Sequence, residues 1–461
     1  MPRYPGRQNR HRKLKLINRR KAICKLVEHP GLVAPDSLRF HWLPSSPKRV
    51  SKVRFSHAGM LYVLVALVAL GPLSLATPTS DHATLLHHYE YVFPDSSIYV
   101  YDMDNRGALV KHVNVPTSAG VRGTVASAAS GMLYISFGSD RGNGGSVLKY
   151  NLMTDQVVWV KHYPFGIDSM SISPDGNTIY MPTGELVSGG IWKVIDANTG
   201  NVTASIESAG IGPHNTVVSA DGAHVYLGPR GTNYLVVAST RTNQVIRRIG
   251  PVGGVGGIRP FTINGAQSLA FITLSGFLGF QVGDIDTGRI LYTVPVQGFG
   301  ATGRTASAPS HGISLSPDEK EIYLMDSINS YVHVFDVTGL PESAPRQIAD
   351  IRLVGAVSRK ESPCAYDCLK DGWLHHSRDG RYVFVGDSGD VIDTTIRKTV
   401  MTLPALANSR KEIEIDFEGG APLPTWAMNN RSSIGGRAPM VRWSPFSGAA
   451  DAIPMDLQMG S

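Results

Sequence analysis

Apolar and polar residues alternate in short runs along most of the chain, from about residue 90 to residue 417. The clearest runs follow an Asp-Gly turn or a variant of it. The copies are SPDGNTIYM at 173–181, SADGAHVYL at 219–227, INGAQSLAFI at 263–272, SPDEKEIYL at 316–324 and SRDGRYVFV at 377–385, with a degenerate first copy, ASGMLYISF, at 129–137. Alternation with a period of two predicts half-buried β-strands and excludes helical repeats, whose period is about 3.6 residues.

A second motif follows each of these runs and consists of apolar residues, then Asp or a substitute, then a turn and another β-run. Its key positions are Asp102, Asn151, Asp196, Ser239, Asp286, Asp336 and Asp393. The steps between them range from 43 to 57 residues, and each has room for about four strands. Seven such units predict an all-β fold, a seven-bladed β-propeller of four-stranded blades.

The two ends of the repeat region predict how the ring closes. The segment before Asp102 is too short for a complete first blade, and KEIEIDFEGG follows the seventh unit. We therefore expect Lys411–Phe417 to return to the first blade, which removes the free edges of an open ring. The propeller is assigned to residues 88–420. Residues 421–461, rich in Pro, Gly and Ser, are expected to form a tail without a domain of its own.

The N-terminal part has a different character. Residues 58–76 form an uncharged apolar run, and residues 1–57 before it hold 15 Lys and Arg but only two acidic residues. We expect 58–77 to be a transmembrane signal-anchor helix or a signal peptide cleaved after Ala76, followed by a linker over 78–87. The basic arm 1–57 is then cytoplasmic and disordered, and the propeller is membrane-anchored outside the cytoplasm or secreted.

Composition and charge narrow the function classes. The chain has 49 Gly, 29 Pro and only 18% charged residues, which excludes a coiled coil, while 42% hydrophobic residues exclude wholesale disorder. The net charge of +7 comes from the arm, because the rest of the chain holds 29 of the 44 basic and 35 of the 37 acidic residues. The folded body therefore lacks the basic excess that binding to nucleic acid requires.

The combined motif resembles that of the YVTN-repeat β-propellers, a family of bacterial exported proteins. SPDGNTIYM with WKVIDANTGNVTASI, and SPDEKEIYL with YVHVFDVTG, are the segments that resemble it best. The resemblance implies the fold and a place in the cell envelope. It implies little about activity, because relatives include surface-layer proteins and lactonase-like enzymes.

Candidate site residues lie where loops lead into the innermost strands, about seven residues before each Asp-Gly turn. This position is occupied by Gly123, Asp168, His214, Gly257, His311 and Gly372. Asp168, His214 and His311 are suitable ligands for a divalent transition metal, or suitable as an acid and base pair. Arg122, Arg259 and Arg304 nearby are suited to an anionic substrate. The alternative is that these polar residues only line a water-filled channel.

The segment before the last blade, RKESPCAYDCLKDGWLHHSRDG, departs most from the repeat. Cys364 and Cys368 within it predict a small disulfide loop if the body is exported. Free thiols, or a metal site completed by His375 or His376, are the alternatives. In a strand, those two imidazoles face opposite sides, so at most one can point to the channel.

Two functions remain in view. The first is a binding scaffold without enzymatic activity, which presents its face to a protein, an envelope polymer or a small molecule. The second is a lactonase-like or metal-dependent hydrolase with its site at the channel mouth. Convergence of Asp168, His214 and His311 on one point would favour the second, and the sequence favours the first because no repeat carries a recognisable catalytic motif.

Overall fold

The computed structural model describes residues 86–253, 257–300, 308–355, 357, 359–365 and 369–423. The basic arm, the apolar segment 58–77, most of the linker and all but the first three residues of the predicted tail lie outside these residues. In the described part of the chain, no helix has the length and hydropathy needed to cross a bilayer.

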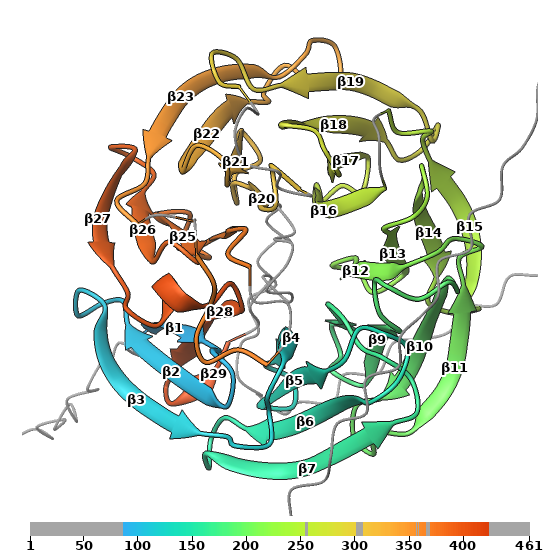
Figure 1. The fold of residues 1–461 in the computed structure, drawn as a ribbon, viewed down its shortest axis with the longest axis vertical. Coiled ribbons are helices and arrows are strands. Elements are labelled where there is room, and N and C mark those ends of the chain that lie inside the picture. Colours follow the sequence, from blue (N-terminus) through green and yellow to red (C-terminus); the bar gives the residue numbers. More distant parts are fainter. Residues whose placement is uncertain are drawn as a thin grey trace, which may run out of the picture. The chain divides into compact units, whose positions relative to one another are not determined.

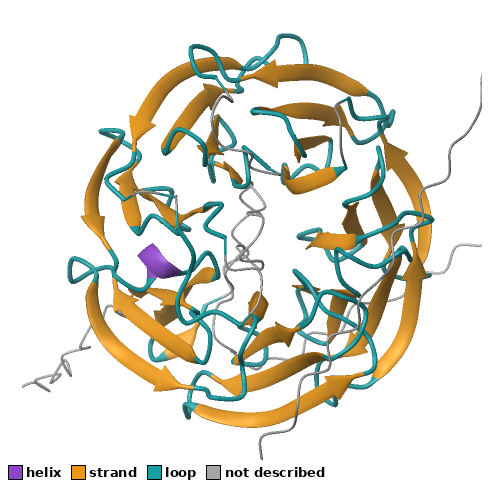
Figure 2. Cartoon of the chain, in the orientation of Figure 1, coloured by secondary structure: helices purple, strands orange, loops and turns teal. Residues whose placement is uncertain are grey.

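Seven antiparallel sheets form a ring around a central axis, as the sequence predicts (Figure 1). The only helix in the described ranges is one short 3₁₀ turn, η1 (Leu406–Asn408), and strands make up the ring (Figure 2). Six blades are built from four consecutive strands, with the first strand in chain order innermost.

The strands of blades 2 to 4 are β4 (Val121–Ser127), β5 (Met132–Gly138), β6 (Gly145–Asn151) and β7 (Gln156–Tyr163); β8 (Ser171–Ile172), β9 (Thr178–Pro182), β10 (Ile191–Asp196) and β11 (Val202–Glu207); and β12 (Pro213–Val218), β13 (His224–Pro229), β14 (Leu235–Ser239) and β15 (Gln244–Ile249).

The strands of blades 5 to 7 are β16 (Ile258–Ile263), β17 (Leu269–Leu274), β18 (Gly279–Asp284) and β19 (Ile290–Pro295); β20 (Ile313–Leu315), β21 (Glu321–Asp326), β22 (Tyr331–Asp336) and β23 (Arg346–Arg352); and β24 (Trp373–His376), β25 (Tyr382–Gly386), β26 (Asp390–Asp393) and β27 (Lys398–Thr402).

Blade 1 combines the two ends of the described chain. It contains β1 (Leu86–Val92), β2 (Ser97–Asp102) and β3 (Ala108–Asn114), and its innermost strand is β28 (Glu412–Glu418). All seven residues of β1 pair antiparallel with β28, from Leu86 opposite Glu418 to Val92 opposite Glu412. The closing strand predicted at 411–417 is confirmed within one residue. A two-residue strand, β29 (Ala421–Pro422), adds a fifth member beyond β28.

The hydrophobic core is divided among the blade interfaces. Seven buried clusters occur in the described residues, and each joins two neighbouring blades. Alternate residues of one strand serve opposite interfaces: Val147 packs toward blade 3 and Leu148 toward blade 1. Period-two alternation in this fold therefore separates two buried faces, and the edge of each innermost strand faces the channel.

The second motif is an Asx turn that ends the third strand of most blades. In blade 3, Oδ1 of Asp196 accepts hydrogen bonds from the backbone N–H groups of Asn198 and Thr199, at 2.9 and 2.7 Å. In blade 5 this position is Asp284, whose Oδ1 accepts from the N–H of Thr287. The choice of Asp286 from the sequence was wrong by two residues, because the turn has the spacing Asp-x-x-Thr-Gly.

Candidate functional site

The polar residues at one end of the channel come from the same repeat position in successive blades. Arg122 lies in β4, Asp168 precedes β8 and His214 lies in β12, at intervals of 46 residues. One interval is about one blade, so the ring places the three side chains next to one another. All three are buried.

Asp168 orients the imidazole of His214. The Nδ1–H of His214 donates to Oδ2 of Asp168 at 2.8 Å, since a carboxylate can only accept. Oδ1 of Asp168 accepts from the backbone N–H of Ser169 at 2.9 Å. The Nε2 atom of His214 is buried and has no hydrogen-bond partner in the described ranges. An Asp–His pair of this geometry leaves Nε2 as the proton acceptor.

Arg122 neutralises the carboxylates behind this pair. Its Nη2 lies 3.2 Å from Oδ2 of Asp168, 3.1 Å from Oε1 of Glu185 and 3.5 Å from Oδ2 of Asp140. The Arg122 side chain is only 1% exposed. The positive charge of this arginine, which was predicted to hold an anionic substrate, is therefore already balanced by the protein's own acids.

Glu185 joins Arg122 to two further arginines. Its Oε2 accepts from Nη1 of Arg230 at 3.0 Å and from Nη1 of Arg259 at 3.3 Å. Burial alone would raise the pKa of Glu185, but His214 and the neighbouring arginines lower it below the usual range. Glu185 is thus a buried anion that aligns Arg230 and Arg259 at the channel mouth.

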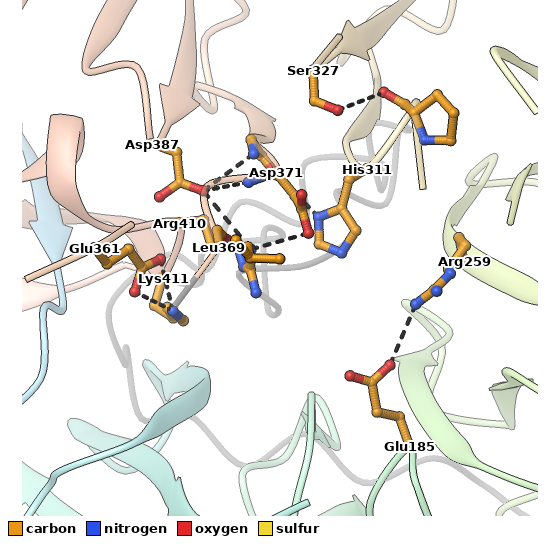
Figure 3. A network of polar contacts seen from close by, with 12 residues as sticks. Glu185, Arg259, His311, Ser327, Glu361, Leu369, Asp371, Asp387, Arg410 and Lys411 are labelled. Carbon is orange, nitrogen blue, oxygen red and sulfur yellow. Dashed lines mark hydrogen bonds and ion pairs between the residues drawn. The ribbon is translucent and has the colours of Figure 1, made fainter. Parts of the chain in front are cut away.

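The opposite side of the mouth is built around blade 7 and the closing strand. The Nδ1–H of His311 donates to the carbonyl oxygen of Gly372 at 3.1 Å, and Oδ2 of Asp387 accepts from the N–H groups of Asp371 and Gly372. Nη1 of Arg410 lies 3.6 Å from Oδ2 of Asp371. Figure 3 shows this group facing Glu185 and Arg259 across the mouth, with His311 between them.

Two carboxyls beside the closing strand have opposite pKa shifts. Burial, reinforced by Glu361, raises the pKa of Asp387 to about 8. Burial also opposes ionisation of Glu361, but Lys411 and Arg410 lower its pKa. Both carboxylate oxygens of Glu361 lie 2.9 Å from Nζ of Lys411. The pair Glu361–Lys411 is therefore ionic, while Asp387 is protonated at neutral pH.

These groups enclose a cavity of about 280 Å³, which we call the mouth cavity. It is lined by Asp140, Arg141, Glu185, Leu186, His214, Arg230, Arg259, His311, Leu369 and Asp371. The lining residues come from blades 2 to 6 and from the segment before β24. Both predicted imidazoles, His214 and His311, thus face one space.

A metal ion fits the mouth poorly. Donor atoms of Asp168, Glu185 and His214 lie within 4.8 Å of one another, and His311 is not part of this group. The guanidinium groups of Arg122, Arg230 and Arg259 already balance the two carboxylates, at 3.0 to 3.3 Å. A divalent cation would have to displace them against charge repulsion. The predicted trio of Asp168, His214 and His311 does not form one coordination sphere.

His375 and His376 were candidates for the channel mouth, of which at most one was expected to point to the channel, and neither lines the mouth cavity. They are adjacent in β24, so their rings face the two neighbouring blades. Nδ1 of His376 lies 2.7 Å from Oγ of Ser314 in blade 6, and burial lowers the pKa of His376 to about 3. The ring lines a separate cavity of about 460 Å³ with Tyr323 and Asp379, beside the Asp-Gly turns.

His375 points to blade 1 and lies between Glu90 and Glu412. Burial opposes its protonation, but the carboxylates of Glu90 and Glu412 raise its pKa to about 10. His375 is therefore an imidazolium in a blade interface.

Two predicted residues, Arg304 and Cys368, lie outside the described residues. Cys364 is disulfide-bonded. Its pairing with Cys368 remains a prediction.

Sequence reasoning missed Glu185, Arg230, Asp140 and Asp387. Each lies in the loop between the second and third strands of a blade, which reaches the same end of the channel as the loops before the innermost strands. A signal was present: Glu185, Arg230 and Asp387 follow the Asp of the preceding Asp-Gly turn by ten, nine and eight residues. The segment GDSGD at 386–390 contains one of these loops.

Comparisons with known proteins support the fold alone. No family model matches the chain, and no curated protein is similar to it. Among solved structures, a functionally unknown protein from Desulfotomaculum acetoxidans is similar, with 12% identity and a TM-score of 0.53. The similarity covers 71% of this chain and 98% of that protein. Membership of the YVTN-repeat family therefore remains a prediction.

Proposed function

We propose that this protein is a binding scaffold of the cell envelope, a YVTN-type propeller that holds a small anionic ligand in the mouth cavity. The observation that carries the proposal is the meeting of Arg230, Arg259, His214 and His311, from three blades, in one space of about 280 Å³. Cavities of this size suit small molecules, and guanidinium groups suit carboxylate and phosphate.

The charge balance at the mouth favours the binding of an anion. The cations at the mouth are Arg122, Arg141, Arg230, Arg259 and Arg410, and the acids that oppose them are Asp140, Asp168, Glu185 and Asp371. Asp387 adds no charge at neutral pH because its pKa is raised to about 8. One positive charge remains even with both histidines neutral. The side chain of Arg230 is 30% exposed, so its guanidinium can reach a ligand from the solvent side.

A thermal-shift titration of the full chain with citrate, D-glucuronate and inorganic phosphate tests this proposal. At least one probe should raise the melting temperature, and Arg259→Met should abolish that rise. Arg247→Met is the matched control, because Arg247 pairs with the exposed Asp286 on the outer side of the ring. No shift with any probe, or an equal shift in Arg259→Met, contradicts an anion site in the mouth cavity.

The proposed location rests on the charge asymmetry around residues 58–77, with 15 Lys and Arg before the apolar run. A reporter fused after the propeller, active only outside the cytoplasm, should be active. Activity that is unchanged when residues 58–77 are deleted contradicts export through this segment.

A second candidate function is hydrolysis of an ester or lactone in the same cavity. It is favoured by the Nε2 atom of His214, which is buried, has no partner in the described ranges and is oriented by Asp168. Such an imidazole can take a proton from an attacking water. If this function holds, His214→Gln should abolish hydrolysis of γ-thiobutyrolactone, followed by thiol release. Hydrolysis that is undetectable in the wild type rejects this function for the probe class.

A further inference from the structure

The strongest unassigned feature lies where the ring closes, between blade 7 and blade 1. We call this interface, formed by β24 on one side and β1 and β28 on the other, the closure seam. Along β28, Ile413 and Ile415 pack toward blade 2, so Glu412, Glu414 and Asp416 all face blade 7. These three acids are at most 2% exposed.

The neighbouring strand adds a fourth buried carboxyl group. Glu90 in β1 is fully buried and lies directly opposite Glu414 in the β1–β28 pair. Two ionised carboxylates at directly opposed positions would destabilise an antiparallel pair. Burial disfavours the ionised form of both side chains and, together with Asp416, raises the pKa of Glu414 well above its usual range.

Only one fully buried basic side chain contacts Glu90 and Glu412 in the described residues. Nε2 of His375 lies 3.2 Å from Oε2 of Glu90, and its Nδ1 lies 3.3 Å from Oε1 of Glu412. His88 and Arg378 contact Asp416 from the rim, where their side chains are 21% and 36% exposed. Glu90 and Glu412 therefore share a single imidazole, and no Lys or Arg ion pair to either is found in the described ranges.

Each of the two glutamates also has a second carboxylate oxygen that does not contact His375. Oε1 of Glu90 and Oε2 of Glu412 are buried and have no hydrogen-bond partner in the part of the chain described. A buried carboxylate oxygen without a partner is costly. One donor atom from each of Glu90, His375 and Glu412 lies within 4.8 Å of the other two, so small side-chain movements bring all three within bonding distance of one ion, about 2.0–2.2 Å.

We propose that the closure seam binds one divalent cation of the Zn²⁺ or Mn²⁺ type through Glu90, His375 and Glu412. Two carboxylates and an imidazole are a donor set that such ions accept, and the two negative charges balance the ion. His375 loses its proton to solvent when one ring nitrogen binds the ion, and the other N–H can still donate to a carboxylate. The ligands come from β1, β24 and β28, so the ion ties blade 7 to both strands of the closure.

The seam differs from the mouth in the feature that matters for a cation. At the mouth, three guanidinium groups surround Asp168 and Glu185, whereas at the seam the basic side chain between Glu90 and Glu412 is an imidazole, which is itself a suitable metal ligand. An ion at the seam would act on the stability of the ring and not on ligand binding in the mouth cavity.

Metal content and thermal stability of the full chain test the proposal. After dialysis against ZnCl₂ or MnCl₂ and then against buffer, elemental analysis should find one ion per chain. Chelation with EDTA should lower the melting temperature by several degrees, and the same ion should restore it. Glu90→Gln and Glu412→Gln, which preserve side-chain shape, should each weaken the affinity in calorimetry by at least about 100-fold.

Two control variants make the result specific. Glu418→Gln changes an exposed acid at the end of β28, and His214→Gln changes a histidine that lines the mouth cavity. Both variants should retain one ion per chain. The proposal is overturned if the wild type retains no ion and shows no saturable binding. It is equally overturned if the Glu90→Gln/Glu412→Gln double variant binds as tightly as the wild type, or if His214→Gln alone loses the ion.

Discussion

Nδ1 of His214 lies 2.8 Å from Oδ2 of Asp168, although 46 residues separate them in the chain. The same interval separates Asp168 from Arg122, which contacts it from the other side at 3.2 Å. In this ring, residues that are one repeat length apart in the sequence lie within hydrogen-bonding distance of each other at the channel mouth. The polar network therefore arises because three successive blades carry a polar residue at the same position of the repeat.

Breaking the buried ion pair between Arg122 and Asp168 at the mouth should strongly reduce the free energy of unfolding. Asp168→Ala leaves Arg122 with one fewer carboxylate in a site that is 1% exposed, and we expect a loss of about 3–5 kcal/mol in the free energy of unfolding. Urea denaturation measures this loss. Asp286→Ala, in an exposed pair with Arg247, is the control and should unfold like the wild type. Equal stability of the two variants would show that the mouth network contributes nothing to folding.

The closing strand should be indispensable for the ring. A chain that ends at Asn408 lacks β28, and with it the buried Ile413 and Ile415, worth about 4–10 kcal/mol together on the scale of Ile-to-Ala substitutions. That loss is comparable with the whole stability of a domain. Calorimetry should show aggregation or no cooperative transition. A chain that ends at Leu423 keeps every described strand and should melt like the full chain; similar melting of both truncations would refute the role of β28.

The cysteine pair should be oxidised in exported protein. Cys364 is disulfide-bonded in the structure, and Cys368 is the cysteine nearest to it in the sequence. Thiol blocking followed by mass measurement, with and without reductant, should show a difference of two protons confined to the peptide that contains both residues. Free alkylation of both thiols before reduction would contradict the pairing.

Asp387 should make stability depend on pH in a particular direction. Burial and Glu361 raise its pKa from 3.8 to about 8, so the folded state holds a proton that the unfolded state releases between these pH values. The stabilising contribution is complete below about pH 4 and is lost as the pH rises through about 8.

The variant Asp387→Asn removes this titration and keeps an oxygen that can accept from the N–H groups of Asp371 and Gly372. Between about pH 5 and 8, the free energy of unfolding of the wild type should fall more steeply than that of the variant, by up to about 1.4 kcal/mol per pH unit. Parallel curves would mean that Asp387 ionises normally.

The fold was accessible from the sequence because its signals are local. Asp-Gly turns, Asx turns and period-two runs each report on a few residues, and their repetition determines the number of blades. The register was less secure: Asp284 and Asp286 both precede Thr287, and only the hydrogen bond from the Thr287 N–H identifies the turn residue.

Only part of the candidate site could be predicted from the sequence. Repeat phase placed Asp168 and His214 together, but Glu185 and Arg230 belong to loops with a second phase, which becomes visible only when the ends of the second strands are known. Charge balance was also hidden, because no one-dimensional pattern indicates that Arg122 would be saturated by three acids. The position of His375 away from the mouth has a simpler cause. The loops before the innermost strands and the first residues of those strands, such as Arg122 and His214, reach the mouth, whereas His375 lies further along β24 and faces a neighbouring blade.

The pairing of β1 with β28 also has a consequence for biosynthesis. Translation makes β1 before every other described strand, yet its inner partner, Glu412–Glu418, comes after all the strands of blades 2 to 7. A nascent chain on the ribosome can assemble those blades in order while blade 1 still lacks its innermost strand. The ring consequently stays an open arc for more than 300 residues of elongation, and its final closure is a single late event.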